Sequence, residues 1–249
     1  MMPVRILGSG PVRVTWDELP PALTAAQLAT VDEWWRDAAS AAESARFDGR
    51  LLSFAGGSRD DAGVIHLRGC FVPYRYYWAQ RRGLALGVAP LAVSGITVVT
   101  EGREAFALFA RRAAGVTDWP SRIELVPSGG LSAESAKPSG EVDYTGQLIA
   151  EFTEETGWSA TSVRAVTAFA WLFDPDSATH DIACRIDLAA GTTRAGALES
   201  FRSREYTAPE WVPVAALSRF AREHAAEIVP ASAALIAAFD RAAAKEQNE

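Results

Sequence analysis

Short stretches of alternating hydrophobic and polar residues fill most of the first third of the chain, a pattern typical of half-buried β-strands. One longer stretch, Leu23–Ser44, instead spaces its apolar residues as a helix does, behind a potential N-cap at Thr24. The pattern predicts strands over Val4–Leu7, Val12–Thr15, Leu51–Phe54 and Val64–Val72, and a second helix over Pro73–Arg82. Because Gly83–Ala89 has the composition of a connection, we predict an N-terminal α/β extension over residues 1–88 and a second domain over residues 89–249.

The pattern beyond this connection predicts strands grouped into hairpins, with helices between and after them. The expected strands are Leu91–Thr100 paired with Glu104–Arg111, then Arg122–Val126, and Ser162–Phe173 paired with His180–Leu188. Helices are expected over Thr145–Thr156 and Pro230–Ala244, and a passage from strand to helix over Trp211–Leu217. A loop is expected over Gly191–Gly196. This order predicts the fold class α/β (α+β), in which a mixed sheet lies between helices as an α/β/α sandwich.

Three glutamates gather on one face of the helix predicted over Thr145–Thr156. Glu151, Glu154 and Glu155 stand at i, i+3 and i+4, so that they fall within an arc of about 100° on the helix surface. Carboxylates crowded in this way repel one another unless a cation lies among them, and oxygen ligands suit hard divalent cations such as Mg²⁺. The upstream pair Gly129-Gly130 permits close approach of the backbone, which favours a metal site over the alternative, a solvated acidic helix face.

Composition restricts the classes of partner. The chain has 249 residues and a formal net charge of −7, which argues against a nucleic-acid-binding surface built on general basicity. It contains no apolar run of about 20 residues and no charged N-terminal segment followed by an apolar one, so we expect neither membrane insertion nor secretion. Its two cysteines, Cys70 and Cys184, lack metal-ligand spacing and are expected to be small buried residues in a reducing cytoplasm.

The segment Glu151–Trp158, with a glycine pair upstream, resembles the second half of the Nudix box, whose pattern is Gly-x5-Glu-x7-Arg-Glu-U-x-Glu-Glu-x-Gly-U with U apolar. The matching residues are Glu151, Phe152, Glu154, Glu155, Gly157 and Trp158. The resemblance implies a Nudix-type fold and a hydrolase that cleaves a nucleoside diphosphate linked to a second group, using Mg²⁺ or Mn²⁺. It also implies that Glu151, Glu154 and Glu155 are catalytic and bind the metal.

The first half of the motif departs from the family pattern. Ala150 stands where the family has an arginine that orients the acidic ligands, and the spacing from the glycine pair to the helix is longer than the pattern, so Glu141 has no firm match to the first glutamate. The chain is similar to family members that hydrolyse UDP-glucose and UDP-galactose. It shares with them an N-terminal extension, an expanded box and the absence of that arginine. Short matches at Tyr74-Arg75, Leu86–Val88, Phe109–Arg112 and Val126–Gly130 support this similarity, which implies UMP and a sugar 1-phosphate as products.

The same resemblance suggests further site residues. Glu205, upstream of the last predicted strand, is a candidate catalytic residue that acts on metal or water; the alternative is a glutamate in a surface loop. The expected substrate-binding residues are Tyr74, Arg75, Arg111, Arg112, Gly129 and Gly130. Aromatic faces stack on bases and arginine forks bind phosphate, whereas the adjacent Tyr77 and Trp78 are expected in the core. In an alternating strand only one of Arg111 and Arg112 should face the site.

Two other functions fit the same motif. In the first, the hydrolase acts on a different nucleoside diphosphate derivative, because base and sugar are recognised outside the box. In the second, the protein binds a nucleotide as a regulator without cleaving it, which Ala150 favours and the intact Glu-x-x-Glu-Glu opposes. The partner expected in every case is a small nucleotide, and the sequence carries no signal for an oligomeric state.

Overall fold

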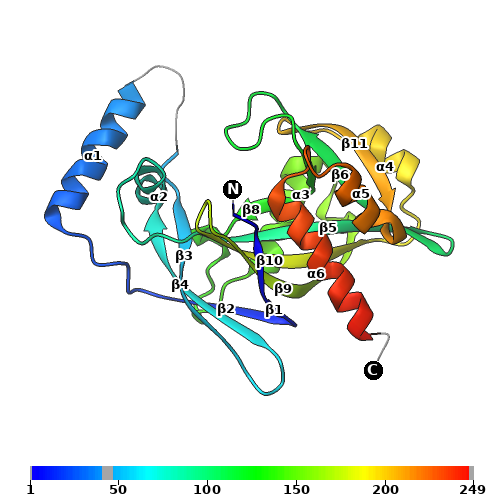
Figure 1. Ribbon diagram of the computed structural model, residues 1–249, viewed down its shortest axis with the longest axis horizontal. Helices are drawn as coiled ribbons and strands as arrows, with labels where there is room; N and C mark the ends of the chain where they lie inside the picture. The colour runs from blue at the N-terminus through cyan, green and yellow to red at the C-terminus, as the bar shows by residue number, and fades with distance from the viewer. Residues whose placement is uncertain (1, 41–46, 247–249) are drawn as a thin grey trace.

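The computed structural model describes residues 2–40 and 47–246, which form one large mixed sheet and one small sheet (Figure 1). The strands of the large sheet are ordered β1-β9-β10-β5-β6-β11, while β7 pairs with β6 and β8 pairs with β5. Their bounds are β1 Arg5–Ser9, β5 Leu91–Glu101, β6 Glu104–Arg112, β7 Ile123–Leu125, β8 Ser128–Gly130, β9 Val163–Asp174, β10 Thr179–Leu188 and β11 Tyr206–Pro213. β10 and β5 run parallel, and the other pairs of this sheet are antiparallel.

Helices cover both faces of the large sheet, and each face has its own hydrophobic core (Figure 1). On one face, α3 (Tyr144–Thr156) buries Leu148 and Phe152, which stand four residues apart on one stripe of the helix. On the other face, α5 (Leu217–Glu223) and α6 (Pro230–Glu246) cover a core that includes Leu235 and Phe239. This layering confirms the α/β (α+β) fold class and the mixed sheet predicted from the sequence.

The N-terminal part of the chain contributes to both sheets. β1 extends the large sheet by pairing with β9, whereas β2 (Val12–Asp17), β4 (Ile65–Pro73) and β3 (Arg50–Arg59) form the small sheet in the order β2-β4-β3. α1 (Ala25–Ser40) and α2 (Tyr74–Gln80) pack with this sheet around Val31 and Trp78. Because the two sheets share one hydrophobic core, the structure offers no separate test of a boundary at residue 88, and that division stays a prediction.

Local hydrogen bonds explain where the first helix starts and why a later one escaped prediction. The hydroxyl of Thr24 accepts a hydrogen bond from the Gln27 amide (3.2 Å), and the Gln27 side chain accepts one from the Thr24 amide (2.9 Å), which forms a capping box at the start of α1. Residues 41–44 of the predicted helix lie outside the described part of the chain. Thr193 caps α4 (Arg194–Ser200), which begins inside the predicted loop and is too short to show a helical period.

Two expectations from composition concern membranes and cysteines. Within the described residues, no helix has the length and apolar character needed to cross a membrane. Cys70 and Cys184 are both buried and carry free thiols, as predicted. A cytoplasmic location stays a prediction.

An aromatic cluster around His180 connects the two sheets. The imidazole of His180 in β10 stacks on Phe54 of β3, with ring centroids 3.7 Å apart, and also contacts Trp171 and Phe173 of β9. Its Nδ1 accepts a hydrogen bond from the Trp171 indole N–H (3.0 Å), an arrangement that requires the neutral ring with its proton on Nε2. Burial lowers the pKa of His180 to about 4, and the positive charge of Arg5 adds to this effect.

We predict that His180 makes the protein less stable on mild acidification. The unfolded chain protonates this histidine below its ordinary pKa of 6.5, whereas the folded protein does so only near pH 4, so the unfolded state binds more protons between these values. The contribution of His180 to the free energy of unfolding should fall by on the order of 1–3 kcal/mol across this range. The free energy of unfolding, measured with urea at several pH values, should depend less on pH in His180→Gln than in the wild type or in the control His66→Gln. The same pH dependence in all three proteins would contradict the prediction.

Candidate active site

The three glutamates of the acidic motif lie in the C-terminal half of α3. Asp143 caps the start of this helix by accepting a hydrogen bond from the Gly146 amide (3.1 Å), and Gly157 ends it in the left-handed region at φ 74°. The buried stripe described above fixes how the helix is rotated against the sheet. Carboxylates here are close to the negative end of the helix dipole, which adds to their mutual repulsion.

Glu155 is the most buried of the three, with 4% of its surface exposed. Its Oε2 accepts a hydrogen bond from the Ser128 amide (3.1 Å), which ties the end of α3 to β8. Burial raises the pKa of Glu155 to about 9; the charge of Glu124 adds to the rise, the Ser128 amide opposes it, and the charges of Glu151 and Glu205 add further. A cation close to this group would favour its ionised form at neutral pH.

Glu151 lies against the backbone of β8 in a space that only glycine leaves open. A Cβ at position 129 would overlap the carboxyl group of Glu151, so the glycine and the glutamate fit together as a pair. Burial raises the pKa of Glu151, a hydrogen bond from Gln147 Nε2 (2.8 Å) opposes the rise, and the charge of Glu154 adds to it. At Gly130, by contrast, a Cβ would meet nothing within 4 Å, so this position has no comparable steric requirement.

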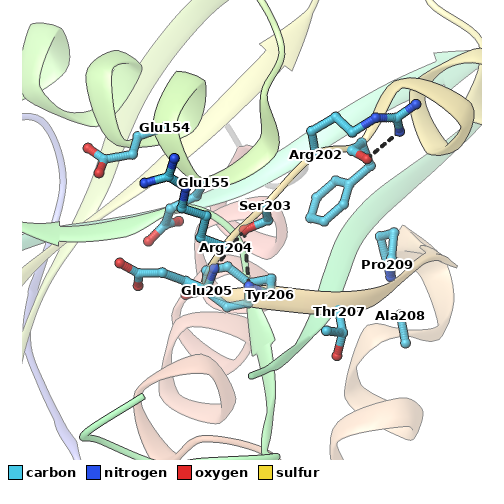
Figure 2. A pocket seen from close by; sticks show the side chains of 11 residues that line it. Glu154, Glu155, Arg202, Ser203, Arg204, Glu205, Tyr206, Thr207, Ala208 and Pro209 are labelled. Carbon is cyan, nitrogen blue, oxygen red and sulfur yellow. Dashed lines mark hydrogen bonds between the residues drawn. The ribbon is translucent and has the colours of Figure 1, made fainter. Parts of the chain in front are cut away.

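A cavity of about 630 Å³ opens beside these carboxylates. It is lined by Glu154, Glu155 and the segment 201–209 that leads into β11. Figure 2 shows the carboxyl groups of Glu154, Glu155 and Glu205 on the same side of this cavity, with the side chain of Arg204 beside them. Glu205 is therefore a neighbour of the α3 glutamates in space, although about 50 residues separate them in the sequence.

A second cavity of about 380 Å³ forms a cleft that adjoins the same carboxylates and follows the first residues of β5 and β10. Glu155, Glu205, Gly129 and Arg112 line its part next to α3. A further group, which we call the β10 part of the cleft, consists of Tyr77, Arg81, Ser94, Asp118, Trp119, Asp174, Asp176, Ser177, Thr179 and Asp181; the remaining lining residues are Val4, Ala92, Glu124, Ser128, Val229 and Ala231. Glu155 and Glu205 line both cavities, which therefore adjoin at the predicted acidic site.

Of the two adjacent arginines, Arg112 faces the cleft and Arg111 does not. Arg112 Nη1 donates to Glu124 Oε2 (2.5 Å) and to the Tyr206 hydroxyl (3.1 Å), and that hydroxyl donates to Glu124 as well (2.7 Å). Arg111 instead forms an ion pair with Glu227 (3.0 Å) outside the cleft. Strand alternation thus selects one arginine, as expected. Glu124 was not predicted, because a single glutamate in a three-residue strand matches no motif.

The structure corrects the placement of Tyr74 and Arg75, which line neither cavity. The Arg75 guanidinium forms ion pairs with Asp48 (2.5 Å) and Asp32 (3.3 Å), and the Tyr74 side chain is exposed. Their part of α2 therefore packs within the N-terminal region and is directed away from the α3 carboxylates. The physical reason is the rotation of this short helix, which seven residues are too few to reveal in the sequence.

α2 meets the cleft one turn later, through Tyr77 and the C-cap residue Arg81. The Tyr77 hydroxyl donates to the carbonyl of Ser177 (3.3 Å), and Arg81 forms an ion pair with Asp118 (2.8 Å). Trp78 is buried, as predicted, whereas Tyr77 is only partly buried because one side of its ring borders the cleft.

The donor set suits a hard divalent cation in chemistry, since Glu151, Glu154, Glu155 and Glu205 offer only oxygen. In residues 2–40 and 47–246, however, no three Asp, Glu, His or Cys side chains are arranged so that they share one metal position. Two of the four glutamates, Glu154 and Glu205, are exposed and free to rotate, whereas the other two are fixed against β8. A cation would therefore have to draw the exposed pair towards the buried pair.

Comparison with known proteins gives a likeness to solved Nudix structures, while no protein-family model and no curated protein matches the chain. The chain is similar to the NUDIX domain of Shewanella oneidensis NrtR complexed with ADP ribose, at 12% identity over 70% of this chain and 97% of that chain, with a TM-score of 0.45. It is also similar to a C. elegans Ap4A hydrolase binary complex, at 12% identity over 63% and 99% of the two chains, with a TM-score of 0.42. A NUDIX hydrolase from Alicyclobacillus acidocaldarius gives 13% identity over 59% and 89%, with a TM-score of 0.42.

We predict that Glu155→Gln stabilises the metal-free protein at alkaline pH. The folded-state pKa of Glu155 is about 9 against an ordinary value of 4.5. The contribution of this group to the free energy of unfolding is therefore complete below pH 4.5 and is lost as the pH rises through 9. Glutamine keeps the acceptor for the Ser128 amide and carries no charge. Thermal unfolding in EDTA should show a midpoint higher by at least about 3 °C at pH 8, and a smaller difference at pH 5.

The matched control for this measurement is Glu154→Gln, which removes an exposed carboxylate from the same helix. Its unfolding midpoint should stay close to that of the wild type at both pH values. Equal or lower stability of Glu155→Gln at pH 8 would show that the buried carboxyl group is not under the electrostatic strain described above.

Proposed function

We propose that this chain is a Nudix hydrolase that cleaves the diphosphate of a nucleoside diphosphate sugar, with UDP-glucose and UDP-galactose as the expected substrates and UMP and a sugar 1-phosphate as products. One observation carries the proposal: Glu155 is buried and Glu151 is half-buried against the backbone of Ser128 and Gly129, with exposed carboxylates beside them. Such crowding of like charge is unfavourable in itself and fits a site built for a cation. The UDP-sugar part of the proposal rests on the sequence resemblance.

In this proposal Glu151, Glu154 and Glu155 hold Mg²⁺ or Mn²⁺. When bound, the ion offsets charge on the diphosphate oxygens and lowers the pKa of an attacking water. The chain's own contribution is to fix the ligands, since the Ser128 amide orients Glu155 and the Gln147 side chain orients Glu151. These two ligands are therefore already in place, and only the exposed Glu154 has to move to complete the set.

Glu205 is our candidate for the group that accepts a proton from the attacking water. It is exposed, lines both cavities, and is close enough to the α3 carboxylates for its charge to raise the pKa of Glu151 and Glu155. A carboxylate at the mouth of the site can receive a proton and return it to solvent. This role is distinct from that of Glu155 and Glu151, which are held by the Ser128 amide and the Gln147 side chain.

The resemblance gives the arginine missing at Ala150 the role of orienting the acidic ligands, and we assign to Arg112 a supporting role that acts through charge. Arg112 comes from β6 and pairs with Glu124, whose charge is the largest electrostatic contribution to the raised pKa of Glu155. By compensating Glu124, Arg112 limits the negative charge around Glu155. For contacts with the rest of the substrate we replace Tyr74 and Arg75 by Tyr77 and Arg81, which border the cleft.

A substrate panel tests the proposal. The protein would be incubated with UDP-glucose, UDP-galactose, ADP-ribose and nucleoside triphosphates in the presence of Mg²⁺ or Mn²⁺, and phosphate-ester products would be quantified by chromatography. We expect UMP and sugar 1-phosphate from the UDP-sugars and no turnover in EDTA. Turnover of another nucleoside diphosphate derivative alone would keep the hydrolase and replace the substrate, while the absence of products from every compound would reject the enzymatic function.

We predict that Gly129→Ala lowers the rate of metal-dependent hydrolysis by about tenfold or more, because the new methyl group displaces the Glu151 carboxyl group from its place against β8. The matched control is Gly130→Ala at the next position, which was expected to bind substrate but lines neither cavity; a Cβ there meets nothing within 4 Å, and the rate should stay within about twofold of the wild type. The measurement is kcat/KM for the best substrate of the panel. Similar rates for both variants would mean that the position of Glu151 does not limit the reaction.

A second candidate function is a nucleotide-binding regulator that does not hydrolyse its ligand. Two observations favour it: Ala150 replaces the family arginine, and in the described part of the chain no three potential ligands share a metal position. A regulator would be stabilised by a nucleotide without forming products. Thermal unfolding with each compound of the panel, read beside product formation, separates this function from the hydrolase.

A further inference from the structure

The cleft contains a buried carboxylate oxygen that the proposed chemistry does not use. Asp181, near the start of β10, is 8% exposed and lines the cleft together with Ser94 of β5. The Ser94 hydroxyl donates a hydrogen bond to Asp181 Oδ2 (2.6 Å), whereas Oδ1 has no hydrogen-bond partner among the described residues. Leaving a buried acceptor unpaired is costly, so this oxygen is poised to receive a donor from a molecule that enters the cleft.

Asp181 differs in this respect from its acidic neighbours Asp174 and Asp176. Asp174 accepts hydrogen bonds from the Asp176 amide (3.0 Å) and the Ser177 hydroxyl (2.8 Å). Asp176 in turn accepts one from the amide of Met2 (3.0 Å). These two carboxylates therefore hold the chain together, whereas Asp181 Oδ1 is buried at the wall of the cleft and lacks a partner within the described part of the chain.

The charge of the β10 part of the cleft restricts what that ligand group can be. Its acidic members are Asp118, Asp174, Asp176 and Asp181. Among the described residues, two guanidinium groups line the whole cleft and both are paired, that of Arg81 with Asp118 and that of Arg112 with Glu124. A phosphate would be repelled here, whereas an uncharged group rich in hydrogen-bond donors would find acceptors. Tyr77 and Trp119 add flat surfaces against which a ring can pack.

The sheet register gives the distance from this acceptor to the acidic motif. Ser94 of β5 is the register partner of Ser128 of β8, whose amide holds Glu155, and β10 is the neighbour of β5 on its other side. Two strand spacings amount to about 10 Å. A sugar attached to a diphosphate that lies at Glu155 spans such a distance.

We infer that Asp181 is a specificity residue that accepts a hydrogen bond from a ring hydroxyl of the sugar in the nucleoside diphosphate sugar. The inference rests on the proposed function, because it takes the diphosphate to lie at the α3 glutamates. Both the ribose and the second sugar carry such hydroxyls, and the two sources share the same recognition chemistry. Ser94 acts as a positioning residue that fixes the carboxylate so that Oδ1 faces the ligand.

Binding of sugar nucleotides to Asp181→Asn tests the inference. Asparagine can still accept the hydrogen bond from Ser94 but presents an N–H group in place of the free oxygen. Isothermal titration calorimetry with Ca²⁺ in place of Mg²⁺, so that a cation can still hold the diphosphate while turnover is slowed, would compare UDP-glucose with analogues lacking single hydroxyls on the ribose or on the glucose. We expect the wild type to bind UDP-glucose about tenfold more tightly than one of these analogues, and Asp181→Asn to lose both this preference and about tenfold in affinity for UDP-glucose.

The matched control is Asp187→Asn, at the far end of the same strand, where the carboxylate pairs with Arg185 (2.8 Å) outside the cleft. It should bind every ligand as the wild type does. If Asp181→Asn does not fold, Ser94→Ala takes its place and should reduce the preference severalfold.

Three outcomes would overturn the role of Asp181. In the first, Asp181→Asn binds UDP-glucose with unchanged affinity. In the second, Asp181→Asn loses the same factor in affinity for UDP-glucose and for every analogue. In the third, the wild type discriminates between ADP-glucose and UDP-glucose but not between ligands with different hydroxyl groups. Failure of the proposed function would look different. In that case the hydroxyl preference would persist with Ca²⁺ while the substrate panel with Mg²⁺ or Mn²⁺ gave no products.

Discussion

The burial of like charges at the end of α3 is the constraint on which the rest of the site depends. Glu155 can occupy its place only because an amide of β8 faces it and a nearby arginine compensates Glu124. Glu151 can lie beside it only because position 129 has no side chain. The hydrophobic stripe of α3 sets the rotation that brings both glutamates to the sheet, so the packing energy of the core holds in place a group of charges that would otherwise separate.

The order of the strands in the large sheet positions the cleft beside the α3 glutamates. The parallel pair β5 and β10 runs through the middle of the large sheet, and the first residues of these strands border the cleft. α3 covers one face of the sheet and α6 the other (Figure 1). Glutamates accumulate at one part of the cleft, and hydrogen-bond acceptors with aromatic rings gather at another, which suits a ligand that is anionic at one end and hydroxylated at the other.

Much of this arrangement is readable from local sequence. The glutamate spacing and Gly157 predict the acidic helix and its end, strand alternation predicts that only one of two adjacent arginines faces the site, and the hairpins β5–β6 and β9–β10 follow from alternating residues around short turns. The rotation of α2 is not readable, because a helix of seven residues carries too little periodicity to distinguish Arg75 from Arg81 as the residue at the cleft. Glu124 and Asp181 are equally hidden, since what distinguishes them is burial and the partners that distant strands supply.

The pairing of β1 with β9 has a consequence for how this protein can vary. β1 comes from the first residues of the chain and closes one edge of a sheet built from residues far downstream. Without it, Ala170–Phe173 of β9 would lose their backbone partners, which would lengthen the part of this edge that can pair with other chains. The same N-terminal region also supplies the α2 wall of the cleft. The N-terminal region therefore cannot be replaced as an independent unit. If this region changes so that ligand preference changes, β1 has to be kept, because it covers part of the sheet edge.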